Sequence, residues 1–183
     1  MYGKNNYSAE VFLFDLKTKR WVVQPAKPSL NCARTSHACC AIGYTTFAFG
    51  GKNENGINNQ LESLRLDYDG SPMSEVWTIM QVYDIAPRKA LLMAPVGNDS
   101  LLIMGGVRGN SEHQCGGIVL NVESMRKVST FDHSNNSTPF FCEVNQHYVD
   151  ADGTIVALAY ADGAQRLIRI DCADMAVRKI GQF

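Results

Sequence analysis

Several short patterns that identify metal or nucleotide sites are missing from this sequence. None of its six cysteines begins a C-x-x-C or C-x-x-H pair, so a zinc site has no local anchor. No G-x-x-x-x-G-K-[ST] or G-x-G-x-x-G segment occurs, so no phosphate-binding loop is predicted. No catalytic constellation can be assembled from the spacing of the residues either. We therefore expect no metal and no cofactor.

The chain also lacks an excess of either charge and lacks a long apolar run. Seventeen basic residues against eighteen acidic ones leave a net charge of −1, which argues against a broad surface for nucleic acid or anionic membranes. No apolar run reaches the roughly 18 residues that a membrane span needs. The first six residues lack the apolar core of a secretory signal. We expect a cytoplasmic or nuclear protein with no nucleic-acid or membrane partner.

The cysteines fit two interpretations. Their even number would allow three disulfides, but 183 residues are enough to form a core without such cross-links. Cys39 and Cys40 are adjacent and would point to opposite faces of a strand, which makes them poor joint ligands. We expect reduced, mostly buried thiols, and the disulfide alternative stays open. The six are Cys32, Cys39, Cys40, Cys115, Cys142 and Cys172.

Long helical periodicity is absent as well. Short apolar segments alternate with turn signals about every ten residues, a pattern typical of an all-β architecture. The predicted strands cover residues 10–15, 21–24, 37–42, 45–49, 61–66, 75–80, 90–96, 100–104, 118–122, 127–131, 140–144, 148–149, 154–158, 167–171 and 177–180. The segments 52–59 and 107–114 are polar and are predicted to be loops.

What the sequence does contain is an internal repeat. Three kinds of landmark recur at nearly one interval, and such a period fixes the architecture more firmly than any single motif. A weaker third copy covers about residues 140–181. The landmarks are the pairs Gly50-Gly51 and Gly105-Gly106 (55 residues apart), Trp21 and Trp77 (56 apart), and Arg34 and Arg88 (54 apart).

These landmarks resemble the kelch-repeat family. In that pattern an Arg precedes a histidine-containing strand, a strand ends in Gly-Gly, and a Trp follows an apolar strand that ends in Asp. The resemblance covers about residues 10–181. It rests on Arg34, His37, Gly50 and Gly51 in the first unit, on Arg88, Gly105 and Gly106 in the second, on Asp171 in the third, and on the Asp15-to-Trp21 hairpin.

The resemblance implies one kelch-type β-propeller domain, or part of one, over residues 1–183. Residues 10–24 would form an outer hairpin, and four-stranded blades would lie at about 34–80, 88–131 and 140–181. Propellers typically have about four to eight blades, so three would leave open edges. Either the chain belongs to a larger propeller, completed by another chain or copy, or it is a self-contained atypical ring or open half-propeller.

Most of the landmark residues have a structural interpretation within this pattern. The glycine pairs would let strands approach closely or adopt positive φ, and Trp21 and Trp77 would pack between blades. Arg34 and His37 would form hydrogen bonds between blades. The alternative is that Arg34 and His37 act as a catalytic pair, since histidine is the common general base.

The polar segments that follow the glycine pairs are the candidate partner-binding loops. In kelch-like propellers these loops surround the channel mouth, where variable residues are held by a rigid scaffold. The resemblance therefore implies a protein-interaction module or assembly scaffold that docks a protein partner there. The candidate contact residues are Lys52, Asn53, Asn55, Asn58, Arg108, Glu112 and His113.

Kelch-like propellers also include enzymes, so the resemblance leaves a second function open. A copper-radical oxidase or a sugar epimerase would have its site at the same channel mouth. An oxidase would need a Tyr–Cys cross-link with histidine and tyrosine copper ligands. Seven tyrosines and four histidines are present, but their spacing does not assemble that set. We therefore expect a non-enzymatic binding protein.

Overall fold

The computed structural model describes residues 7–22, 29–67, 77–82, 84–109, 112–114, 116–132, 143–161, 164–174 and 176–182. All regular secondary structure in these segments is β, and every strand pairs with its neighbours in antiparallel fashion. The all-β prediction is therefore confirmed. Within the same segments, no helix has the length and apolar character needed to cross a bilayer.

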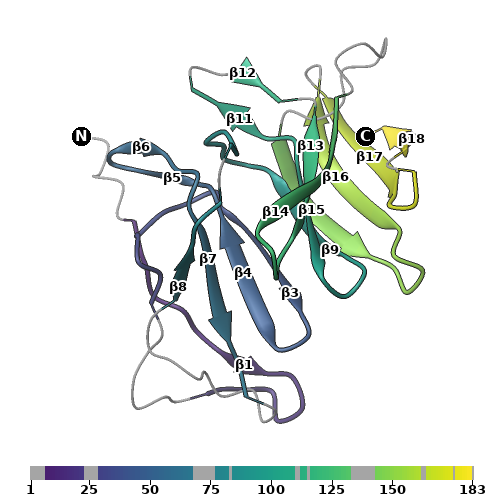
Figure 1. The fold of residues 1–183 in the computed structure, drawn as a ribbon. Coiled ribbons are helices and arrows are strands. Elements are labelled where there is room, and N and C mark those ends of the chain that lie inside the picture. Colours follow the sequence, from purple (N-terminus) through teal and green to yellow (C-terminus); the bar gives the residue numbers. More distant parts are fainter. Residues whose placement is uncertain are drawn as a thin grey trace.

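Three four-stranded sheets follow one another along the chain and lie side by side in Figure 1. In each sheet the strands are neighbours in chain order, so each is a simple meander. The first sheet contains β3 (Ala38–Ile42), β4 (Thr45–Phe49), β7 (Leu61–Arg65) and β8 (Thr78–Met80). The second contains β9 (Leu92–Val96), β10 (Ser100–Met104), β13 (Gly117–Asn121) and β14 (Arg126–Phe131). The third contains β15 (Glu143–Val149), β16 (Ile155–Ala161), β17 (Ala164–Asp171) and β18 (Ala176–Gln182).

Strand β10 shows why the three sheets pack together. Successive residues of a strand point to opposite faces, so a run of apolar residues can supply two cores at once. Leu101 and Ile103 join the core between the first and second sheets, which also contains Phe49 and Leu61. Leu102 and Met104 join the core between the second and third sheets, which also contains Ile155, Ala157, Ile168 and Ile170. Fully burying each large apolar side chain contributes about 1.5–3 kcal/mol.

The two tryptophans have different surroundings. Trp77 is buried with Leu30, Ala48 and Leu64 against the outer side of the first sheet. Trp21 is 66% exposed, so it does not pack between the three sheets, and its packing between blades stays a prediction. The reason for this exposure is local: β1 (Phe14–Asp15) and β2 (Arg20–Trp21) are two residues long and form a separate two-stranded sheet. Trp21 stacks edge-on with the exposed Phe14, at a ring distance of 5.1 Å.

The predicted loops after the glycine pairs contain regular structure. A short hairpin pairs β5 (Lys52–Asn53) with β6 (Gly56–Ile57), and a second pairs β11 (Val107–Arg108) with β12 (Glu112–His113). Both hairpins lie at the upper end of the molecule in Figure 1, away from the turns that join β3 to β4 and β9 to β10. They therefore extend one end of the first two sheets.

Candidate functional site

The first glycine pair is one of the places where the backbone of the second unit contacts the first. Gly50 and Gly51 follow β4 with φ of 71° and 93°. The Gly51 amide donates to the Arg88 carbonyl at 2.9 Å. A Cβ at Gly50 would lie 2.3 Å from that carbonyl oxygen, which no side chain tolerates. Glycine is thus required here by both backbone conformation and close approach, and this contact fixes where the Arg88 segment begins.

The side chain of the first landmark arginine is held by a carboxylate. Arg34 Nη2 lies 2.8 Å from Glu62 Oε1, and the two oppositely charged side chains form a buried ion pair. Glu62 Oε2 accepts from the backbone amide of Asn31 at 2.7 Å and from its side-chain amide at 2.9 Å. Arg34 also donates to the Gln60 carbonyl at 3.2 Å. The segment before β3 is therefore tied to β7.

The second unit lacks this carboxylate. Leu61 pairs with Phe49 just before the first glycine pair, and Gly117 pairs with Met104 just before the second. Leu61 and Gly117 are therefore equivalent, and so are the residues that follow them, Glu62 in β7 and Ile118 in β13. The second unit has an isoleucine where the first has the carboxylate. Arg88 instead donates to two neutral acceptors, the carbonyls of Gly105 at 3.3 Å and Ala86 at 3.4 Å.

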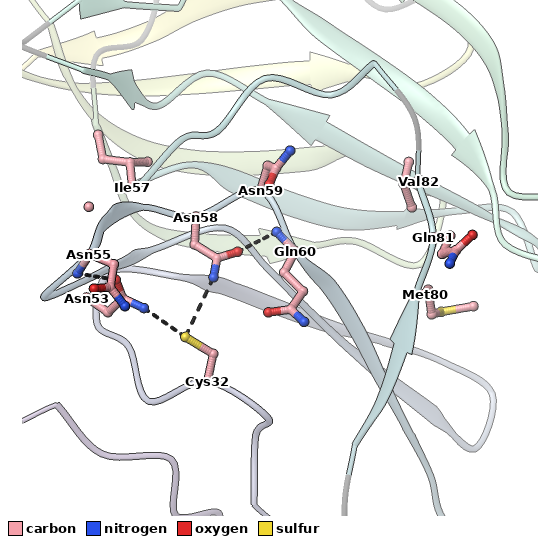
Figure 2. Close-up of a pocket in the computed structure, with 11 residues that line it drawn as sticks. Cys32, Asn53, Asn55, Ile57, Asn58, Asn59, Gln60, Met80, Gln81 and Val82 are labelled. Carbon is pink, nitrogen blue, oxygen red and sulfur yellow. Dashed lines mark hydrogen bonds between the residues drawn. The ribbon is translucent and has the colours of Figure 1, made fainter.

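A polar cavity of about 580 Å³ lies beside the first hairpin. Figure 2 shows Asn53 and Asn58 with their amide groups turned toward the sulfur of Cys32. Asn53 Nδ2 lies 2.8 Å and Asn58 Nδ2 3.7 Å from that sulfur. The lining residues are Cys32, Asn53, Asn55, Gly56, Ile57, Asn58, Asn59, Gln60, Met80, Gln81 and Val82. Side-chain amides that can both donate and accept hydrogen bonds dominate this wall.

A second cavity, of about 400 Å³, lies beside the second hairpin. Its lining residues are Arg88, Glu112, His113, Gln114, Gly116, Gly117, Ile118, Phe131 and Asp132. When the two units are aligned by their strand pairing, five residues that line this cavity occupy the same positions as five that line the first. The equivalent pairs, first unit before second, are Ile57 and His113, Asn58 and Gln114, Gln60 and Gly116, Met80 and Phe131, and Gln81 and Asp132. The repeat therefore places a cavity in the same location in both units, with amide walls in one and charged walls in the other.

The predicted partner-binding residues divide between these two cavities and the surface. Asn53, Asn55 and Asn58 line the first cavity, and Glu112 and His113 line the second. Lys52 and Arg108 are exposed on their hairpins and are not part of either lining. Sequence reasoning missed the thiol of Cys32, the segment 80–82 and Glu62. A charged residue inside the apolar pattern of residues 61–66 was the one available signal for Glu62.

His37 lies against the first glycine pair, since a Cβ at Gly51 would come within 3.0 Å of His37 Cβ. Burial, followed by the nearby charge of Arg34, lowers the pKa of His37, and Glu62 acts in the opposite direction. Its Nδ1 is buried with no hydrogen-bond partner among the described residues. In the same part of the chain, no three His, Cys, Asp or Glu side chains are grouped so that they could hold a metal ion.

The thiols of Cys32, Cys39, Cys40 and Cys172 are free in the structure, and Cys115 and Cys142 lie outside the described residues. Cys39 is exposed and the other three are half-buried, so the prediction of mostly buried thiols is wrong for Cys39. Its strand, β3, turns Ala38 toward the core and Cys39 to the opposite face.

Comparison with models of protein families gives no match to this chain, and a search of curated proteins gives none either. The kelch resemblance therefore stays a prediction from the sequence.

Proposed function

We propose that the three sheets are blades of a kelch-type β-propeller and that the protein is an interaction module or assembly scaffold. Three consecutive four-stranded meanders packed face to face support this architecture. The glycine pairs and the landmark arginines occupy equivalent places in the first two meanders. A chain of repeated units presenting the same end to solvent is suited to binding an extended partner surface.

The main support for a binding function is the pair of equivalent cavities beside the two hairpins. Each opens at the end of its sheet where β5–β6 or β11–β12 extends, and both are lined mainly by polar side chains. Exposed Lys52 and Arg108 lie on the same hairpins. A protein partner docks on this hairpin face, with amide and charged groups in the cavities and the two cations at their margins.

The outer face of the third sheet supports a second contact. Leu158 pairs with Leu167, and Val156 pairs with Tyr148, so these side chains share one face. The three aliphatic side chains are half-buried and Tyr148 is 64% exposed, whereas the opposite face packs into the core shared with the second sheet. In a propeller this outer face packs on a further blade, which another chain or another copy supplies.

Charge reversal on the hairpins tests the docking face. Affinity capture from the native source, followed by quantitative mass spectrometry, compares the wild-type chain with the double variant Lys52→Glu/Arg108→Glu. Lys17→Glu, on the exposed turn between β1 and β2, is the matched control. The proposal expects proteins recovered with wild type and Lys17→Glu to be depleted at least roughly tenfold with the double variant. Recovery of the same proteins in equal amount with all three chains would refute this choice of face.

A further inference from the structure

Arg88 is a buried cation without a matching anion among the described residues. It is 7% exposed, and its two hydrogen bonds go to uncharged carbonyls. None of the ion pairs Arg34–Glu62, Lys127–Asp84 and Arg169–Asp152 involves it. A buried charge normally has a charged partner, because removing it from water is costly unless a counter-charge compensates.

The first unit shows what the second one lacks. There the equivalent arginine, Arg34, is fully buried against Glu62. In the second unit the corresponding position is Ile118, and both Ile118 and Arg88 line the 400 Å³ cavity. The position that a carboxylate occupies in the first unit is therefore an apolar side chain in the second, in the wall of a cavity that Arg88 also lines.

The surrounding charges favour one anionic group and disfavour more. Burial, followed by the positive charge of Arg108, lowers the pKa of Arg88, and a bound anion would offset both effects. Glu112 and Asp132 also line the cavity and are exposed. The negative charge of Glu112 would repel a ligand with two or more charges, such as a phosphate ester, more than a single carboxylate.

We propose that the Arg88 cavity binds a single carboxylate group, which takes the place that Glu62 occupies in the first unit. A planar guanidinium matches a carboxylate in a two-point hydrogen-bonded pair, so this is the anion that the residue type recognises best. The carboxylate comes either from a small organic acid or from an acidic side chain of a protein partner. If the carboxylate belongs to a protein partner, this proposal rests on the proposed function; if it belongs to a small organic acid, it does not.

Acetate is the first probe, titrated into the 183-residue chain against sodium chloride and phosphate at equal ionic strength. Acetate is expected to raise the thermal midpoint relative to chloride, and phosphate is expected to do so less. Calorimetric titration then gives the acetate affinity. An acetate effect no larger than that of chloride would overturn the proposal.

The decisive variants are Ile118→Glu and its uncharged counterpart Ile118→Gln. Ile118→Glu places a carboxylate where Glu62 stands in the first unit, and acetate binding should fall at least tenfold. Ile118→Gln has nearly the same shape and should keep much more of the binding. Equal acetate affinity in the two variants would place the binding elsewhere and overturn the proposal.

A variant on the exposed rim keeps the test valid if substitution at Ile118 prevents folding. Glu112→Gln removes one repelling charge from the surface and should tighten acetate binding by about threefold at low salt. Glu54→Gln, exposed on the turn of the first hairpin, is the matched control and should leave the affinity unchanged. Identical affinities in these two variants would contradict a site beside Glu112.

Blocked tripeptides separate the two sources of the carboxylate. Acetyl-Ala-Glu-Ala-amide binding at least tenfold more tightly than acetate, with the Gln peptide inactive, supports a protein side chain. Equal affinity for acetate and the Glu peptide supports a free organic acid. The capture experiment with Lys52→Glu/Arg108→Glu measures protein partners, whereas the acetate titration measures this site alone. A failure of the proposed docking face and a failure of the proposed carboxylate site can therefore be told apart.

Discussion

Arg34 and Glu62 form an ion pair of 2.8 Å in which both side chains are fully buried. The two residues lie 28 positions apart, in the segment before β3 and in β7. Glu62 also accepts two hydrogen bonds from Asn31 through its other oxygen. The carboxylate therefore joins two parts of the first unit that no backbone ladder connects directly.

Replacing Glu62 should destabilise the protein strongly. Glu62→Ala leaves the Arg34 charge buried without its partner, which typically costs about 3–5 kcal/mol of unfolding free energy. Urea denaturation followed by circular dichroism measures the loss, and exposed Glu54→Ala is the control, expected within about 0.5 kcal/mol of wild type. Similar unfolding free energies for the two variants would show that the ion pair does not stabilise the fold.

The junction at the first glycine pair should tolerate no side chain. Gly50→Ala adds a Cβ at positive φ that would clash with the Arg88 carbonyl, so we expect a loss of about 2–4 kcal/mol. Gly97→Ala also has positive φ, of 62°, but its Cβ would meet no atom within 4 Å, and it should cost only about 1 kcal/mol. Thermal or urea unfolding compares the two. Equal losses would mean that conformation alone, and not the close approach of the second unit, explains Gly50.

Stability should decrease as the pH falls below about the ordinary histidine value of 6.5. Burial lowers the pKa values of both His37 and His147 in the folded protein. In that pH range the unfolded chain binds more protons than the folded one, so unfolding becomes easier as the pH drops toward the folded pKa values. Above pH 6.5 this contribution is complete and constant.

The thermal midpoint between pH 8 and pH 5.5 checks this dependence. His37→Gln should flatten the curve below pH 6.5, whereas His113→Gln, on an exposed hairpin, should leave its shape unchanged. A midpoint that stays level from pH 7 to 5.5 in the wild-type protein would be inconsistent with neutral buried histidines.

The free thiols should react at different rates. Burial, followed by neighbouring Cys39, raises the pKa of Cys40 to about 12, so almost none of it is thiolate at pH 7.5. Since the thiolate is the reactive form, iodoacetamide should label Cys40 slowly and faster as the pH rises. Cys32 lines an open cavity and should be labelled faster than Cys40. Peptide mapping by mass spectrometry follows both sites, and equal rates at pH 7.5 would contradict the raised pKa of Cys40.

The strands of the three sheets were predictable because their signals are local. Residues 100–104 are apolar throughout, and β10 is indeed buried on both faces between two other sheets. Residues 45–49 end at a glycine pair, and β4 ends there as well. Short turns join β3 to β4, β9 to β10 and β13 to β14, which pairs these strands in chain order.

The candidate site was only partly predictable, because its decisive contacts join distant positions. Asn53, Asn58, Glu112 and His113 were identified from their polar segments, but nothing local indicates that they line cavities. Glu62 reads as one polar residue in an alternating strand, and its role appears only when β7 is placed beside the Arg34 segment. The exposure of Trp21 could not be foreseen either, since it depends on how short β1 and β2 are.

The central claim is that the three sheets are propeller blades, with the outer face of the third sheet made to pack on further protein. The solution mass of the 183-residue chain, measured by light scattering together with its thermal unfolding, tests this most directly. If another copy supplies the further blade, we expect a mass above the 20.2 kDa of one chain, and a return to that value when Leu158 is replaced by Arg. If a different chain supplies it, we expect the isolated chain to aggregate or to unfold without cooperativity. A cooperatively unfolding 20.2 kDa monomer would contradict it, because that face would then need no cover.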